Sequence, residues 1–131
     1  MFILPECVSF ILIKDNAILI EQRRLDKEND PGLFAIPGGH CEAGETHEQT
    51  LQRELKEELG ILSLGHEYVC SLIHPGDEEQ IIHYYLVKQW EGDIQCYEAT
   101  EMHWVPINES QKIDIAADRI ALSEYLRLRK N

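Results

Sequence analysis

The chain has 131 residues, the usual size of one domain, and we expect a single domain over residues 1–131. Twelve Lys and Arg stand against 24 Asp and Glu, so the formal net charge is −12. This charge argues against a nucleic-acid polymer as partner, since binding to a phosphate backbone needs a basic surface. Small phosphate compounds stay compatible with it, because metal ions held on carboxylates can offset their charge.

The start of the chain and its cysteines bear on the cellular compartment. The apolar residues 1–4 are too few for a signal peptide and lack a basic flank. No stretch approaches the roughly 18 apolar residues that a membrane helix needs. The four cysteines are scattered without a CxxC pair, which favours reduced thiols, although two disulfides are conceivable. We therefore expect a cytoplasmic protein without a membrane partner.

The first third of the chain reads as short strands and turns. Two apolar runs at residues 7–13 and 17–23 are separated by a polar turn, which predicts a β-hairpin. A polar loop follows at residues 25–32, and a brief apolar stretch leads to Pro37-Gly38-Gly39. These residues predict a tight turn with a bare backbone, whose carbonyls could approach a metal ion or a phosphate.

The pattern then changes to that of a helix. Leu51, Leu55 and Leu59 follow the i, i+4, i+8 spacing of one helix stripe, with Thr46 as N-cap and Gly60 as the stop. The remaining predicted elements are strands at 68–73, 81–90 and 102–107 and a closing helix at 116–129. Strands mixed with two helices predict an α/β (α+β) domain.

Three glutamates of the predicted helix carry the most specific chemistry. Glu54, Glu57 and Glu58 are related by i+3 and i+4 and share one face, where like charges repel. Such a cluster is tolerated when cations neutralise it, and hard oxygen ligands suit Mg²⁺ or Mn²⁺ rather than zinc. A solvated acidic helix face is the alternative. Arg53 lies four residues before Glu57 and could reach back to Glu45, which would tie the loop to the helix.

The stretch 39–61 resembles the Nudix signature, with every defined position filled. The matching residues are Gly39, Glu45, Arg53, Glu54, Leu55, Glu57, Glu58, Gly60 and Ile61. The strands before and after this stretch also fall where a Nudix domain has them. The resemblance implies a Nudix fold for the whole chain, in which a mixed β-sheet is sandwiched between helices (an α/β/α sandwich).

The same resemblance implies roles for these residues. Glu54, Glu57 and Glu58 would hold one or more Mg²⁺ ions together with the Gly38 carbonyl, with Mn²⁺ as a substitute. Glu58 is the preferred ligand, and Glu54 is alternatively the general base toward the attacking water. Glu45 and Arg53 would brace the junction of loop and helix. The leucines of the stripe would belong to the core.

Residues outside the signature extend the expected site. Glu98 looks like the further metal ligand of MutT-type enzymes, with Glu101 as substitute and a surface loop charge as the alternative. Arg23, more than Arg24, could contact a phosphate, and Gly38 and Gly39 would face the substrate; a solvated strand end is the alternative for the arginines. Asp118 is either an N-cap or first-turn acid or the residue that reads the base.

An ionised Asp118 accepts hydrogen bonds only, so it favours a base edge that carries donors, such as N4 of cytosine or N1 and N2 of guanine. The histidines show no HExxH spacing, and His40 could line the pocket. The large aromatic residues are expected in the core rather than in base stacking: Tyr84, Tyr85, Trp90 and Trp104.

The resulting hypothesis is a Mg²⁺-dependent, MutT-like hydrolase. It would cleave a nucleoside triphosphate to the monophosphate and pyrophosphate, with CTP or dCTP, or an oxidised purine such as 8-oxo-dGTP, as substrate. A nucleotide-sugar or ADP-ribose pyrophosphatase is the alternative enzyme, although no added N-terminal segment is seen that would supply its larger site. A non-catalytic nucleotide-binding module is the third hypothesis. A monomer and a homodimer are equally compatible with the sequence.

Overall fold

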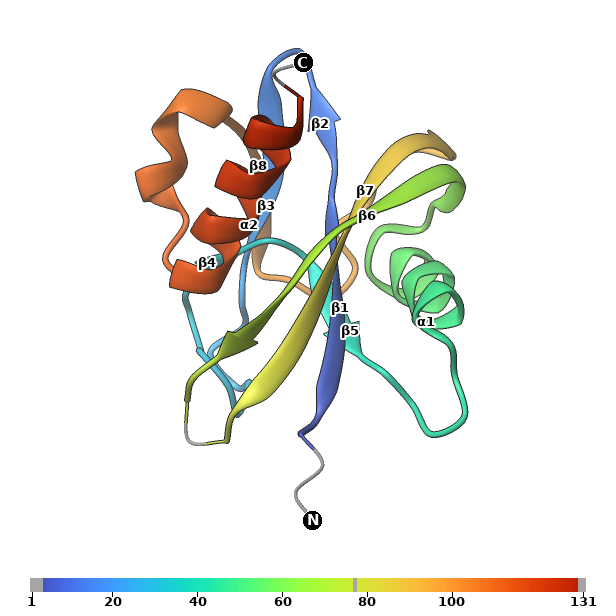
Figure 1. Ribbon diagram of the computed structural model, residues 1–131, viewed down its shortest axis with the longest axis vertical. Helices are drawn as coiled ribbons and strands as arrows, with labels where there is room; N and C mark the ends of the chain where they lie inside the picture. Colours follow the sequence, from blue (N-terminus) through green and yellow to red (C-terminus); the bar gives the residue numbers. More distant parts are fainter. Residues whose placement is uncertain (1–3, 77, 130–131) are drawn as a thin grey trace.

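Figure 1 shows the computed structural model of the protein, which describes residues 4–76 and 78–129. The strands are β1 (Glu6–Ile11), β2 (Ile13–Lys14), β3 (Ala17–Gln22), β4 (Phe34–Ala35), β5 (Gly38–His40), β6 (Leu62–His74), β7 (Gln80–Glu91) and β8 (Glu101–Pro106). The helical segments are α1 (His47–Glu54), the π-helical η1 (Leu55–Leu59), the 3₁₀-helical η2 (Ile107–Lys112) and α2 (Ala116–Leu128). No helix in the described ranges is long and apolar enough to cross a membrane.

The strands form two sheets. The first has the order β5-β1-β7-β6, in which β1 and β7 are parallel and the other pairs are antiparallel. The second has the order β2-β3-β4, and β8 pairs antiparallel with β3 along the whole of Ala17–Gln22. The sheet is therefore mixed, as the sequence predicts.

The predicted hairpin of residues 7–13 with 17–23 is largely wrong. Only Ile13 and Lys14 pair with β3, whereas β1 pairs with β5 and β7 in the other sheet. The physical reason is burial, because residues Cys7–Ile11 are all buried and such a strand needs cover on both faces and a neighbour on each edge.

Helices cover opposite faces of the first sheet (Figure 1). Val8 and Phe10 pack with Leu51, Leu55 and Leu59 of the helical segments α1 and η1 in one core cluster. On the other side of β1, Cys7 and Ile11 pack with residues of α2, among them Ala121, Leu122 and Tyr125. This alternation confirms the predicted sandwich of helices around a mixed sheet, and it confirms the leucine stripe as core.

The predicted helix is present but changes character. Thr46 caps it as expected: its Oγ1 accepts a hydrogen bond from the N–H of Gln49, and Gln49 Oε1 accepts one from the N–H of Thr46. After Glu54 the α-helix becomes one π-helical turn, which ends at Gly60 with a φ of 71°. A π-helical turn inside a longer helix is frequently found at functional sites.

Two further expectations need correction. The predicted strand 68–73 begins six residues earlier, at Leu62. The predicted turn at Pro37–Gly39 is in part strand β5, where Gly38 lies opposite Ser9 and Gly39 opposite Val8. Glycine is needed there for close approach, because a Cβ at Gly38 would lie 2.4 Å from the carbonyl oxygen of Val8.

Candidate functional site

A cavity of about 460 Å³ opens beside the end of α1. Its walls come from segments far apart in the sequence: β3, β5, the helical turn η1, the loop between β7 and β8, and the start of α2. Among the carboxylates that line it are Glu21, Glu54, Glu58, Glu98 and Asp118. The cavity therefore combines most of the acidic residues that the sequence singles out with Glu21, which it does not.

Three of these carboxylates lie close enough to share one cation. Glu54, Glu58 and Glu98 each offer an oxygen within 4.8 Å of the others. Glu58 is only 6% exposed, and its buried Oε2 has no hydrogen-bond partner. A Cβ at Gly39 would lie 2.1 Å from the carboxyl carbon of Glu54, so only glycine leaves room for that carboxylate. An all-oxygen donor set with an unpartnered buried oxygen fits a hard divalent cation.

The pKa values of these carboxyl groups also favour a cation site. Burial raises the pKa of Glu54, and it raises the pKa of Glu58 well above its usual value, with Glu21 adding to the effect. Each carboxylate is therefore costly to ionise in the metal-free protein. A bound cation would offset this cost, since it favours the ionised form of every ligand.

Glu21 is the site residue that sequence reasoning missed. It lies on β3, is buried, and lines the cavity beside Glu58. Burial raises the pKa of Glu21 to about 7. A signal was present in the sequence: a glutamate directly follows the four apolar residues 17–20 of a predicted strand. A charge that continues a buried run indicates a polar role inside the fold.

Arg53 forms the second half of the site. Its Nε donates to Glu45 Oε2 at 2.7 Å and its Nη2 to Glu45 Oε1 at 2.9 Å, which is the contact that the sequence predicts. Nη2 also donates to the carbonyl oxygen of His40 at 2.8 Å, and Nη1 to Glu54 Oε1 at 2.7 Å. The hydrogen bonds from Arg53 lower the pKa of Glu45 to about 2. The guanidinium thereby holds the loop after β5 against the helix that carries the carboxylate cluster.

Glu57 lies on the Arg53 side rather than in the cluster. One of its oxygens is 3.2 Å from Arg53 Nη1, and its side chain is about half exposed. Within the described residues it does not belong to the group that could share a cation with Glu54 and Glu58. Its predicted role as a metal ligand stays a prediction.

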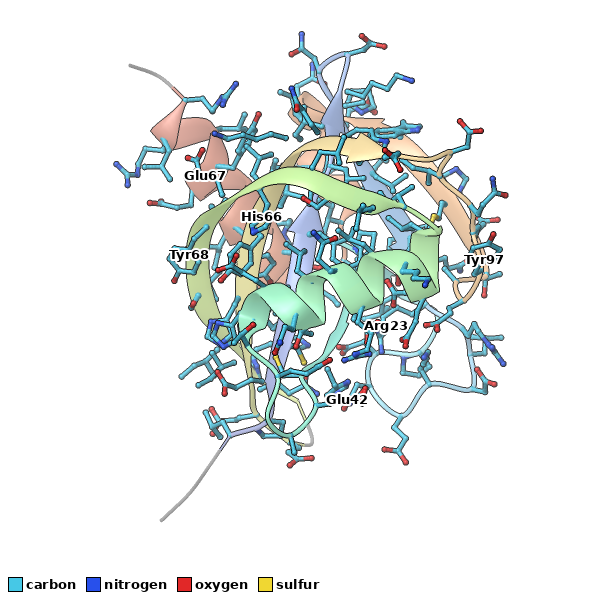
Figure 2. The ribbon with its side chains drawn as sticks, turned by 90° about the vertical axis from the view of Figure 1, so that its right-hand side faces the viewer. Arg23, Glu42, His66, Glu67, Tyr68 and Tyr97 are labelled. Atoms are coloured by element: carbon cyan, nitrogen blue, oxygen red, sulfur yellow. The ribbon has the colours of Figure 1, made fainter. Side chains whose placement is uncertain are left out.

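The structure separates Glu98 from Glu101. Glu98 lies in the carboxylate cluster because its loop is fixed to the end of the helix, where the N–H groups of Gln95 and Tyr97 donate to the carbonyls of Leu59 and Glu58. Figure 2 shows Tyr97 beyond this end of the helix. Glu101 is instead exposed and lies 2.8 Å from His103 Nε2.

The predicted substrate residues surround the same cavity. Gly38, Gly39 and His40 line it with Arg23, whose Nε donates to the carbonyl oxygen of Asn29 at 3.0 Å. Figure 2 shows Arg23 on the same side of α1 as Glu42. Arg24 also borders the cavity but is paired with Asp26 at 2.6 Å.

Asp118 forms part of the cavity wall and is 2% exposed. It is not the N-cap of α2, a position held by Ile115. Its Oδ1 accepts a hydrogen bond from the hydroxyl of Tyr84 at 2.6 Å, and its Oδ2 accepts one from the N–H of Ile36 at 2.9 Å. Burial raises the pKa of Asp118 to about 6.

The large aromatic residues lie away from the cavity, whose lining among the described residues includes no Tyr or Trp. Tyr84 is fully buried, and Tyr85 and Trp90 pack against the core as expected. Trp104 differs from the expectation, because it is 39% exposed on β8. All four cysteines carry free thiols.

Comparison with known proteins places the chain among enzymes. The family model described as NUDIX domain matches residues 4–126. The CTP pyrophosphohydrolase of Escherichia coli K12 is 34% identical over 128 residues, which cover 95% of this chain and 93% of that protein. The 8-oxo-dGTP diphosphatase of the same organism is 33% identical over 101 residues, covering 76% of this chain and 78% of that protein. A crystal structure of a MutT NUDIX hydrolase from Burkholderia pseudomallei superposes with a TM-score of 0.85 at 23% identity, covering 94% and 98% of the two chains.

Proposed function

The chain belongs to the NUDIX domain family and is a Nudix hydrolase, and from this premise we propose that it cleaves a nucleoside triphosphate to the monophosphate and pyrophosphate. Members of the family use divalent metal ions, and we propose Mg²⁺ as the ion here, with Mn²⁺ as a substitute. The observation that carries the proposal is the carboxylate cluster of Glu54, Glu58 and Glu98 in the wall of a cavity that Arg23 and Asp118 also line.

The proposed division of labour follows from these contacts. When bound, the cation polarises phosphoryl oxygens and offsets the charge that repels a nucleophile. Glu58 and Glu98 are its ligands. Glu54 contacts both sides of the site, since Arg53 binds its Oε1 while the carboxylate lies in the cluster. We assign Glu54 the proton of the attacking water, because its carboxylate lines the cavity within the cluster and is held in place by Arg53.

Arg23 and Asp118 are proposed to hold the two ends of the nucleotide. The Arg23 guanidinium offers a planar set of donors to phosphate oxygens. Asp118 already accepts two hydrogen bonds, and each carboxylate oxygen has a second acceptor position. A base that presents a donor, such as N4 of cytosine, would use that position. CTP or dCTP is therefore the first substrate to test, and 8-oxo-dGTP the second.

The direct test is a substrate panel with Mg²⁺ that compares normal and oxidised triphosphates, nucleotide sugars and ADP-ribose. We expect a triphosphate to be hydrolysed with the highest kcat/KM and to give only monophosphate and pyrophosphate on chromatography. Water labelled with ¹⁸O identifies the attacked phosphorus, because the label enters the monophosphate after attack at the α-phosphorus and pyrophosphate after attack at the β-phosphorus. Preferred cleavage of ADP-ribose or a nucleotide sugar would replace the proposal by the alternative enzyme.

The role of Asp118 has a test that does not depend on stability. Asp118→Asn presents an amide donor in place of one acceptor, so the ratio of kcat/KM for CTP over UTP should fall by about 10-fold or more, a difference of about 1.4 kcal/mol. Asp114→Asn is the matched control, since Asp114 also accepts a backbone N–H, from Phe34, but lies outside the cavity lining. An unchanged ratio in Asp118→Asn would remove Asp118 from base recognition.

A further inference from the structure

A second cluster of ligand-type side chains lies outside the cavity, where α1 begins. It consists of Glu6 at the start of β1, His47 at the start of α1 and His83 on β7. None of the three residues lines the cavity described above. The two imidazole rings are stacked with their centroids 3.9 Å apart. Three separate elements thus bring two imidazoles and one carboxylate to a single point.

The ligand atoms of this cluster converge. His83 Nε2 is 2.7 Å and His47 Nε2 is 3.2 Å from the same oxygen of Glu6, Oε1, and one ligand atom from each residue lies within 4.8 Å of the other two. A tetrahedral ion with bonds of about 2.0–2.1 Å needs ligand atoms about 3.3–3.4 Å apart. The His47 to Glu6 distance already matches this spacing. The His83 to Glu6 distance would widen by about 0.6 Å, which the partly exposed Glu6 carboxylate allows.

A hydrogen bond at its other ring nitrogen, Nδ1, also fixes the orientation of His83. Its Nδ1 lies 2.6 Å from Ser71 Oγ, which in turn lies 2.6 Å from the hydroxyl of Tyr68. A metal-binding histidine typically donates its second ring N–H to such an oxygen, which fixes the ring and directs the other nitrogen at the ion. Figure 2 places Tyr68 on the ribbon of β6, toward the end of α1 that lies opposite Tyr97.

We propose that Glu6, His47 and His83 form a second metal site, selective for a borderline cation such as Zn²⁺ and separate from the carboxylate cluster. Two imidazoles and one carboxylate are a recurrent set of protein ligands for Zn²⁺, with water in the fourth position. The cluster of Glu54, Glu58 and Glu98 offers only oxygens, which suit Mg²⁺ instead. Zn²⁺ bound there ties the first residue of α1 to β1 and β7.

The test is a titration of the full chain with ZnCl₂ and with CoCl₂ after chelation, in saturating Mg²⁺ so that the carboxylate cluster is filled. We expect one Zn²⁺ per chain, the visible absorption of tetrahedral Co²⁺, and a rise in Tm with Zn²⁺. His47→Gln and His83→Gln should each abolish the Co²⁺ spectrum and weaken Zn²⁺ binding by more than 10-fold. Ser71→Ala should weaken it by about 10-fold while the spectrum persists.

Two controls separate this site from its neighbours. His66→Gln removes an imidazole that also contacts a carboxylate, that of Glu48, and a serine, Ser63, but has no second histidine in contact with it in the described structure. Glu58→Gln removes the central ligand of the carboxylate cluster. Zn²⁺ binding should persist in both variants. The proposal is overturned if His47→Gln and His83→Gln bind Zn²⁺ as the parent does, or if binding disappears in Glu58→Gln. Mg²⁺-supported hydrolysis should stay unchanged in His47→Gln.

Discussion

Glutamates gather at two places near the end of α1, around Arg53 and around Glu58, and the two groups differ in whether a cationic side chain neutralises them. Around Arg53, the carboxylates of Glu42, Glu45, Glu54 and Glu57 all lie within 3.2 Å of one guanidinium. Around Glu58, the carboxylates of Glu21, Glu54 and Glu98 gather with no ion pair from Lys or Arg to Glu21, Glu58 or Glu98 among the residues described. The pKa of Glu45 is lowered, whereas the pKa values of Glu21 and Glu58 are raised.

The difference indicates a structural role for the carboxylates paired with Arg53 and a binding role for those around Glu58. A carboxylate whose charge is already neutralised by Arg53 stabilises the fold and has a weaker need for a bound cation. A buried carboxylate without a counterion destabilises the metal-free protein and stabilises it once a cation arrives. Glu54 belongs to both groups, so it connects the ion pairs of Arg53 to the carboxylate cluster.

The largest expected effect comes from Glu58→Gln, which removes the most buried carboxylate of the cluster of Glu54, Glu58 and Glu98. We expect the rate of hydrolysis to fall by about 100-fold or more, since neutralisation of phosphate charge is the main contribution of such a site. The free energy of unfolding without metal should not fall, because the amide has no ionisation to oppose burial. Steady-state kinetics and urea unfolding in a chelator measure the two effects. Loss of stability together with activity would show that the Glu58 carboxylate stabilises the metal-free fold.

Arg53→Gln removes the cation that neutralises the first group of glutamates. It leaves Glu45 and Glu54 without their cation, and we expect the free energy of unfolding to fall by about 3 kcal/mol. Urea unfolding at neutral pH measures this change. Adding Glu45→Gln should recover part of the loss, because it removes one of the orphaned charges. A cost below about 1 kcal/mol would class the brace with ordinary surface ion pairs.

Glu21→Gln tests the group of glutamates around Glu58 through the pH dependence of stability. The pKa of Glu21 rises from 4.5 to about 7 on folding, so the native state binds more protons between these values and stability falls as pH rises through this window. The variant lacks this penalty and should be more stable than the parent by about 3 kcal/mol above pH 7. The two proteins should converge near pH 4. Thermal unfolding in a chelator across this range measures the difference, and parallel curves would contradict it.

The smallest effect is expected for Glu57→Gln. The exposed contact of Glu57 with Arg53 is an i, i+4 pair, so its removal should cost about 0.5 kcal/mol or less. Activity should change by less than about 10-fold, because Glu57 lies outside the carboxylate cluster. Steady-state kinetics of hydrolysis, as for Glu58→Gln, measures this change. A loss equal to that of Glu58→Gln would place Glu57 among the metal ligands, as the family resemblance implies.

Much of the fold was predictable where the signal is local. The capped helix, its leucine stripe and its glycine end follow from residues within one or two turns of each other. The predicted hairpin was wrong because β3 and β7 both contain enough apolar residues to pair with β1. Its pairing with β7 is decided by burial on both sides of the sheet, over a separation of more than 70 residues.

For the site, the sequence alone determined the elements that lie within residues 39–61: the brace between Arg53 and Glu45 and the acidic face of the helix. Helical periodicity and short loops place these side chains without help from the rest of the chain. Only the tertiary structure selected Glu98 over Glu101, added Glu21, buried Asp118 against Tyr84, and brought His47 beside His83. These positions depend on strand pairing and helix packing between distant segments, which no local spacing specifies.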